Sequence, residues 1–187
     1  MTRKNNPKQT VESIIDIATK LFMEKGYEHT TMQDIVDGLG MSKGAIFYHF
    51  KSKDDILDAV VKRMIRQLES AARAIANDTA LTAHEKMRQI ISAINISDGP
   101  NGGLIEELHR PDNAMLHQRS ISGTIDMLAP IMADVITQGM EEGVYHTAYP
   151  LETIEFILAG DQLVFDAGFF QRTTEELQSR VAALARN

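Results

Sequence analysis

The sequence predicts an all-α protein with an N-terminal three-helix unit and a larger C-terminal helical domain. Apolar residues recur at steps of three and four along most of the chain, which is the spacing of amphipathic helices. Residues that favour helix starts and stops separate these stretches, and no segment shows the alternation of a half-buried strand. With 43% apolar and 24% charged residues among 187, the chain has the composition of a folded globular protein.

The first helix is predicted from one apolar stripe near the N-terminus. The stripe consists of Val11, Ile14, Ile15, Ala18, Leu21 and Phe22. Gly26 follows it, and glycine readily adopts the left-handed backbone conformation that ends many helices. We therefore expect this helix to stop at Gly26.

Two short helices should follow. The second is expected over about residues 31–38, where Thr30 and Gln33 have the spacing of a capping box. A Gly-Leu-Gly segment then interrupts the chain, and Ser42 is a natural N-cap for a third helix that runs to about Phe50. The three helices form one unit with a tight turn between the last two.

A long fourth helix should connect the two domains. Ser52 and Asp55 have the Ser-x-x-Asp form of a helix start, and apolar residues then keep helical period over about five turns, to about residue 77. A helix over about 53–77 is long enough to connect two domains rigidly. We therefore predict an N-terminal domain over 1–53 and a C-terminal domain over 54–187.

The rest of the chain is predicted to be helical with polar breaks. Helices are expected near residues 81–97, 103–109, 113–142, 150–171 and 174–186. Pro130 should kink or divide the third of these, because proline lacks the amide proton of a helix interior. Gly143 is well placed to end it.

Charge and cysteine content narrow the function. The net charge is −7, yet residues 1–53 carry +2 and residues 54–187 carry −9, so only the N-terminal unit is mildly basic. The chain has no cysteine, which excludes disulfides, thiolate metal sites and cysteine nucleophiles. No apolar stretch is long enough for a membrane span, and the start lacks the apolar core of a secretion signal. We expect a cytoplasmic protein that has no contact with a membrane.

The third helix has an unusual concentration of aromatic residues. Ile46 and Phe50 lie four apart and are expected to face the core, which leaves the other side chains of Ser42 to His49 outside. A helix that follows a supporting helix and a tight turn can enter the major groove of DNA. The alternative is that the aromatic residues only pack the three-helix unit together.

Several residues of this helix have the chemistry of DNA contact. Gly44 would let the backbone approach DNA closely, and the amides at the helix start favour a phosphate. Tyr48 and His49 can donate to phosphates, and Tyr48 can contact a thymine methyl group. Lys43 and Lys53 flank the helix as candidate phosphate anchors.

Two motifs closely resemble those of the tetracycline-repressor (TetR/AcrR) family of bacterial regulators. The first is Gly-Tyr-x-x-Thr-Thr-Met at 26–32, and the second is Gly-Met-Ser-Lys-Gly-Ala-Ile-Phe-Tyr-His-Phe-Lys-Ser-Lys-Asp at 40–54. The resemblance implies a homodimeric DNA-binding repressor that reads a palindromic operator and is released when a small-molecule effector enters the C-terminal domain. An activator of the same fold remains the alternative.

On these grounds we predict one set of DNA-binding residues: Thr30, Thr31, Ser42, Lys43, Gly44, Phe47, Tyr48, His49 and Lys53. The chain departs from the family pattern at Val36 and Leu39, where alanine is common, and at Phe47, where tyrosine is usual. Phe47 can therefore supply only apolar contact, and the phosphate-donor role passes to Tyr48, His49 and Lys53.

The last two predicted helices have apolar faces that could meet those of a second subunit. The predicted dimer interface consists of Leu158, Gly160, Phe165, Gly168, Phe169, Leu177, Val181 and Leu184. Gly160 and Gly168 lie about two turns apart and could allow close helix packing at a two-fold axis, although they could equally be points of helix weakening.

An effector site is predicted from the methionines, because thioethers fill irregular apolar space. The candidate ligand-binding residues are Met87, Met115, Met127, Met132 and Asp161, and a methionine-rich core without a ligand is the alternative. His109, Asp112 and His117 are the nearest approach to a metal site, but we expect no metal and no cofactor. The chain has no Gly-x-Ser-x-Gly, P-loop or His-Glu-x-x-His motif, so we do not expect an enzyme.

Overall fold

The computed structural model describes residues 7–94, 109–110, 113–164, 172–173, 175–176 and 179–180. Every element in these ranges is a helix, which confirms the predicted all-α class. The predicted helices over 103–109 and 174–186 lie almost wholly outside these ranges. Within them, no helix combines the length and apolarity needed to cross a bilayer.

The first three helices follow the predicted order. Helix α1 covers Pro7–Lys25, α2 covers Met32–Leu39 and α3 covers Lys43–His49. Gly26 has φ +81° and its amide donates to the Phe22 carbonyl, so glycine ends α1 as expected. Gly40, with φ +62°, likewise ends α2.

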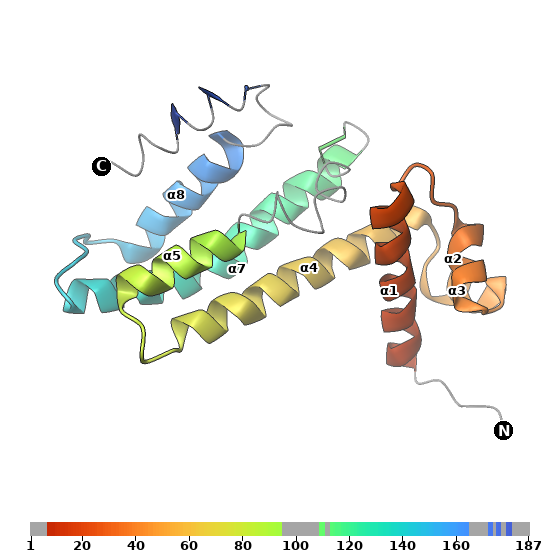
Figure 1. Ribbon diagram of the computed structural model, residues 1–187, viewed down its shortest axis with the longest axis horizontal. Coiled ribbons are helices and arrows are strands. Elements are labelled where there is room, and N and C mark those ends of the chain that lie inside the picture. Colours follow the sequence, from red (N-terminus) through yellow and green to blue (C-terminus); the bar gives the residue numbers. More distant parts are fainter. Residues whose placement is uncertain are drawn as a thin grey trace.

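Helix α4 covers Lys53–Ala76 and starts with the predicted capping box. Ser52 accepts a hydrogen bond from the Asp55 amide, and the Asp55 carboxylate accepts from the Ser52 amide. Figure 1 shows α4 running from the three-helix unit to the opposite end of the molecule. The long connecting helix is therefore confirmed.

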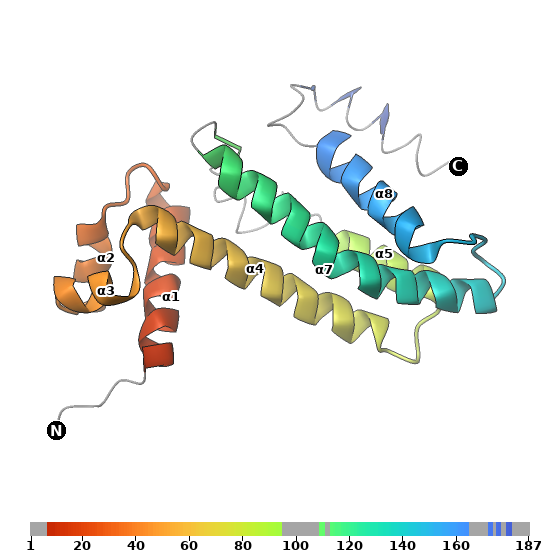
Figure 2. The ribbon, with the colours of Figure 1, turned by 180° about the vertical axis from the view of Figure 1, so that it is seen from behind.

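Three further helices follow α4. They are α5 (Ala83–Ile94), α7 (Ala114–Glu141) and α8 (Pro150–Val164). Helices α5 and α7 pack against α4, and α8 packs against α7. Helix α7 contacts α4, α5 and α8, and Figure 2 shows it lying between α4 and α8. Gly143, with φ +75°, ends α7 as predicted.

Of the two expected effects of Pro130, a kink or a division of α7, the division is wrong, and the kink stays a prediction. The helix continues from Ala114 to Glu141 with Pro130 inside it. Pro130 and Asp126 both lie on the exposed side, so water can reach the carbonyl that loses its amide partner. This position reduces the cost of a proline in the helix interior.

Buried apolar residues form two separate cores. The first joins α1, α2 and α3 to the first half of α4, and its fully buried members include Ile14, Ile35, Ile46 and Leu57, one from each helix. The second joins the far half of α4 to α5, α7 and α8. Helix α4 thus belongs to both cores, which makes it a rigid link between them.

Candidate nucleic-acid interface

Helix α3 is held to the N-terminal core by one side. Ser42 caps its start by accepting a hydrogen bond from the Ala45 amide at 3.3 Å. Ile46 is fully buried and Phe50 nearly so, as predicted, and the Phe50 amide donates to the Ile46 carbonyl at 3.0 Å. Burial of these two side chains fixes which face of α3 points away from the protein.

The outward face of α3 contains the predicted recognition residues. The Tyr48 side chain is 77% exposed, Lys43 and Gly44 are also exposed, and Phe47 and His49 are half-buried. The Tyr48 and His49 rings meet edge to face, with centroids 5.0 Å apart. The alternative interpretation required all of these aromatic residues to pack inward. The exposure of Tyr48 shows that they do not.

Neither steric crowding nor backbone conformation requires a glycine at position 44. A Cβ atom at this position would meet no atom within 4 Å, and the backbone is not in the left-handed region. A glycine in a helix costs up to about 1 kcal/mol relative to alanine. The open space beside Gly44 is therefore free for close approach of a DNA backbone.

The predicted cap of α2 is one residue out of register. Thr31, not Thr30, is the N-cap, and it forms the capping box with Asp34 rather than with Gln33. Thr30 is only 1% exposed, and its hydroxyl donates to the Gly26 carbonyl at 2.8 Å. Thr30 thus stabilises the fold from a buried position. Of the two threonines, only Thr31 lies at the exposed start of α2.

Lys53 is also engaged inside the protein. Its Nζ donates to the Tyr27 carbonyl at 2.7 Å and lies 4.0 Å from the centre of the Tyr27 ring. The ammonium group is therefore held against the α1–α2 loop, and its predicted contact with a phosphate stays a prediction. Lys53 fixes the start of α4 against this loop.

Sequence reasoning missed Lys51 as a candidate. Its exposed Nζ donates to the Phe47 carbonyl at 2.8 Å, at the C-terminal end of α3. The spacing of four residues from Phe47 to a lysine just past the helix end is the pattern that could have identified it. Lys51 and Lys43 thus place a cation at each end of α3.

Asp34 connects the end of α1 to the start of α2. Its hydrogen bonds to Lys25 and Thr31 hold the pKa of the Asp34 carboxyl well below the ordinary value of 3.8. Lys25 Nζ lies 2.9 Å from the carboxylate, which joins the end of α1 to the start of α2. The charged carboxylate therefore stabilises the angle between these two helices.

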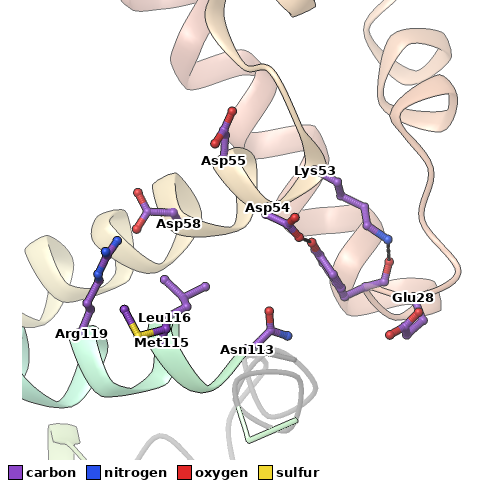
Figure 3. A pocket seen from close by; sticks show the side chains of 10 residues that line it. Glu28, Lys53, Asp54, Asp55, Asp58, Asn113, Met115, Leu116 and Arg119 are labelled. Atoms are coloured by element: carbon purple, nitrogen blue, oxygen red, sulfur yellow. Dashed lines mark hydrogen bonds between the residues drawn. The ribbon is translucent and has the colours of Figure 1, made fainter. Parts of the chain in front are cut away.

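An open cleft of about 700 Å³ separates the three-helix unit from the start of α7 (Figure 3). Tyr27, Glu28 and the first turns of α4 form one side. The other side is formed by Asn113, Met115, Leu116 and Arg119. Met115 lines this cleft and is 65% exposed, away from the C-terminal core, and its predicted contact with an effector stays a prediction.

The other predicted effector residues lie in the C-terminal domain. Met132 is buried in the second core, and Met87 and Met127 pack against that core. Asp161 on α8 is partly buried, and this burial raises the pKa of its carboxyl above the ordinary value. The structure brings the three methionines to one core, and their role toward an effector stays a prediction.

The predicted dimer interface needs correction at α8. Leu158 is only 5% exposed and belongs to the core with Ile154, so it is not available to a second subunit. The outward residues are instead Phe156, Ile157 and Leu163, which are 82%, 57% and 42% exposed, together with Gly160. The remaining predicted interface residues lie outside the described part of the chain: Phe165, Gly168, Phe169, Leu177, Val181 and Leu184.

The candidate metal residues are only partly described. The His109 and His117 rings meet edge to face at 4.8 Å, and Asp112 lies outside the described residues. Among the residues that the structure describes, no group of three or more His, Asp or Glu side chains is arranged to hold a metal ion.

Comparison with known proteins identifies two family models. Residues 14–60 match the model of bacterial regulatory proteins of the tetR family, and residues 99–186 match a tetracyclin repressor-like C-terminal domain. The HTH-type transcriptional repressor KstR2 of Mycobacterium tuberculosis is 24% identical over 150 residues. That match covers 71% of this chain and 67% of the repressor.

Solved structures show the same fold over most of the chain. A TetR-family transcriptional regulator (ECA1819) from Pectobacterium atrosepticum has a TM-score of 0.72 and 24% identity, and the match covers 99% of this chain and 94% of that one. The transcriptional regulator FadR from Bacillus subtilis, solved in complex with stearoyl-CoA, has a TM-score of 0.62 and 23% identity. In that match, 84% of each chain is covered.

Proposed function

Because this chain belongs to the TetR/AcrR family of bacterial transcriptional regulators, we propose that it is a repressor that binds a palindromic operator and is released by a small-molecule effector. The observation that carries this proposal is the outward face of α3, where Tyr48 is 77% exposed and Gly44 has open space beside it. A helix presented in this way fits the major groove.

We propose distinct roles for the residues of this face. Tyr48 contacts base edges and phosphate, His49 and Lys43 donate to phosphates, and Phe47 supplies apolar contact. The exposed helix starts at Thr31 and Ser42 supply supporting backbone contacts to phosphates. Lys53 acts as a positioning residue through its bond to Tyr27.

The test is selection of bound DNA from a genomic library with the purified full chain. We expect one enriched palindromic sequence with the natural protein and none with Tyr48→Ala. Tyr149→Ala is a matched control, because Tyr149 is 67% exposed in the other domain. Equal enrichment by all three proteins would reject the role of α3.

The effector is proposed to bind in the C-terminal core that contains Met87, Met127 and Met132, and to contact the partly buried Asp161 of α8 as well. Repeating the DNA selection with cell extract present should lower the enrichment if the extract contains the effector. Because FadR was solved with stearoyl-CoA, the first defined compounds to test are acyl-CoA thioesters. A repressor that no extract fraction releases would contradict control by a ligand.

We also propose that the repressor acts as a homodimer in the cytoplasm, where the chromosome is accessible to it. The exposed apolar residues of α8, Phe156, Ile157 and Leu163, are the described part of the interface. A palindromic operator presents two equal half-sites, which a two-fold dimer matches with one α3 helix each.

A further inference from the structure

The far end of α4 is held by a polar network around the buried Lys86 side chain. Lys86 is only 4% exposed, and its Nζ donates to the Ala76 carbonyl and to the Gln138 side-chain oxygen, both at 2.7 Å. Gln138 donates to Glu142 at 2.6 Å, and Glu142 accepts from the Ala83 amide at 3.0 Å. These bonds join the ends of α4 and α7 to the start of α5, so this end of α4 is fixed.

Near the other end of α4, an exposed ion pair connects the start of α7 to the three-helix unit. Arg110 and Glu28, here called the junction pair, form an ion pair of 3.0 Å between the segment before α7 and the α1–α2 loop. Both side chains are about half exposed, at 47% and 49%. An ion pair with this exposure contributes little and is easily broken.

Two contacts connect the junction pair to α7 and to the N-terminal core. The Asn113 amide donates to the Arg110 carbonyl at 2.9 Å, which ties Arg110 to the first residues of α7. Leu116, on the first turn of α7, packs against the core that α1, α2, α3 and α4 share. A displacement of this end of α7 therefore reaches the three-helix unit directly as well as through α4.

The cleft of Figure 3 lies between these surfaces. Arg119 of α7 extends toward the side of α4 that carries Asp55 and Asp58, across open space. The open cleft beside this exposed ion pair leaves room for the two surfaces to move, whereas the network around Lys86 joins closely packed helices.

We propose that the Arg110–Glu28 junction pair, together with Leu116, is a breakable connection that holds the three-helix unit in a defined orientation against the N-terminal end of α7. This inference rests on the proposed function and specifies how the C-terminal domain controls it. Breaking the connection widens the range of orientations of α3. DNA affinity then falls, because two α3 helices must be ordered again to fit both half-sites.

The experiment is a charge-reversal cycle on the full chain. Glu28→Arg and Arg110→Glu each place like charges at the junction and should weaken operator binding about threefold to tenfold. The double variant restores an opposite pair and should return to within about twofold of the natural Kd. Reversal of Glu69 and Arg73, an exposed pair on α4 with a 3.0 Å contact, is the matched control and should change little.

A distance measurement tests the connection without DNA. Because the chain has no cysteine, Glu24→Cys on α1 and Gln118→Cys on α7 can be spin-labelled specifically, diluted with unlabelled protein. We expect a broader distance distribution in each single reversal variant and a narrow one in the double variant. Thermal unfolding checks that all variants are folded.

The outcomes separate this inference from the proposed function. If the natural protein selects no DNA, the proposed function fails. The distances between the spin labels still show whether the junction pair fixes the orientation of the three-helix unit. If the natural protein binds its operator and the single variants match it in affinity and in distance distribution, the inference is overturned. Tighter binding by the single variants would overturn it too.

Discussion

Gly44 is a residue for which we expect folding and DNA binding to make opposite demands. Alanine at this position meets no atom within 4 Å and removes the entropic cost of glycine in a helix. We therefore expect Gly44→Ala to raise the free energy of unfolding by up to about 1 kcal/mol. The new methyl group should at the same time weaken operator binding, because it holds the backbone away from DNA.

Calorimetry and a DNA titration measure the two effects of Gly44→Ala separately. Gly123→Ala in α7 is the control, because a Cβ there makes an ordinary contact of 3.8 Å with Ile65 of α4. That substitution should stabilise the protein without changing DNA affinity. If Gly44→Ala binds the operator as tightly as the natural protein, the proposal that DNA approaches the backbone closely at Gly44 is wrong.

Asp34 gives the N-terminal unit a dependence on pH. Its pKa is lowered in the folded state by Lys25 and Thr31, so its contribution to stability is complete above the ordinary value of 3.8. The contribution is lost as pH falls below that value toward the folded-state pKa. We therefore expect Asp34→Asn to lower the free energy of unfolding at pH 7. Denaturant unfolding monitored by circular dichroism measures this change.

Between pH 7 and pH 3, the stability of Asp34→Asn should therefore change less than that of the natural protein. Asp126→Asn removes the same charge from an exposed site on α7 and serves as the control. Parallel pH curves for Asp34→Asn and the natural protein would show that the Lys25 contact contributes nothing.

Thr30 and Thr31 show where sequence reasoning stops at this scale. Both threonines precede a residue, Gln33 or Asp34, that can complete a capping box, so spacing alone does not choose between them. The choice depends on burial, because the Thr30 hydroxyl finds the Gly26 carbonyl when α1 ends there. Ser42 and Ser52 were predictable because each stands alone before its helix.

At the scale of elements, α8 is the helix whose orientation the sequence could not settle. It is apolar around most of its circumference, and a helix of this kind gives no sign of which side packs inward. Ile154 and Leu158 face α7, whereas Phe156 and Ile157 face outward. The helix itself was predicted, and only its contact face was wrong at Leu158.

The outward face of α8 leads to a prediction about assembly. Phe156→Glu places a charge on the most exposed aromatic residue of this face and should weaken the dimer at least about thirtyfold. Analytical ultracentrifugation over a concentration series measures this change. Val144→Glu, at a 54% exposed residue of the α7–α8 turn, is the control and should remain dimeric.

Loss of dimerisation should also be visible in DNA binding. Phe156→Glu leaves α3 untouched, so a monomer can still occupy one half-site with low affinity. A Phe156→Glu protein that is dimeric at micromolar concentration would place the interface elsewhere, on the part of the chain beyond α8.

At the scale of the whole molecule, charge separates the two domains as the sequence indicated. Residues 1–53 carry +2, and the remainder carries −9. Which charges meet across the domains was not predictable, because Glu28 and Arg110 are distant in sequence and come together only when the start of α7 reaches the α1–α2 loop. Long-range pairs of this kind depend on tertiary packing, and local pattern contains no information about them.

This separation of charge predicts how salt affects binding. With an acidic C-terminal domain, attraction to DNA comes from a few cations near α3, so the logarithm of the binding constant should fall linearly with the logarithm of salt concentration. Lys43→Ala removes one of these cations at the exposed start of α3 and should reduce the slope by about one.

Lys20→Ala distinguishes a local phosphate contact from a general effect of charge. Lys20 is 65% exposed on α1, where it pairs with Glu24, so its loss lowers the net charge of the domain equally. If Lys43 touches a phosphate, only Lys43→Ala changes the slope, because counterion release depends on the phosphates actually neutralised. Equal slopes for the two variants, both below that of the natural protein, would mean that the net charge of the domain, and not the position of α3, determines binding.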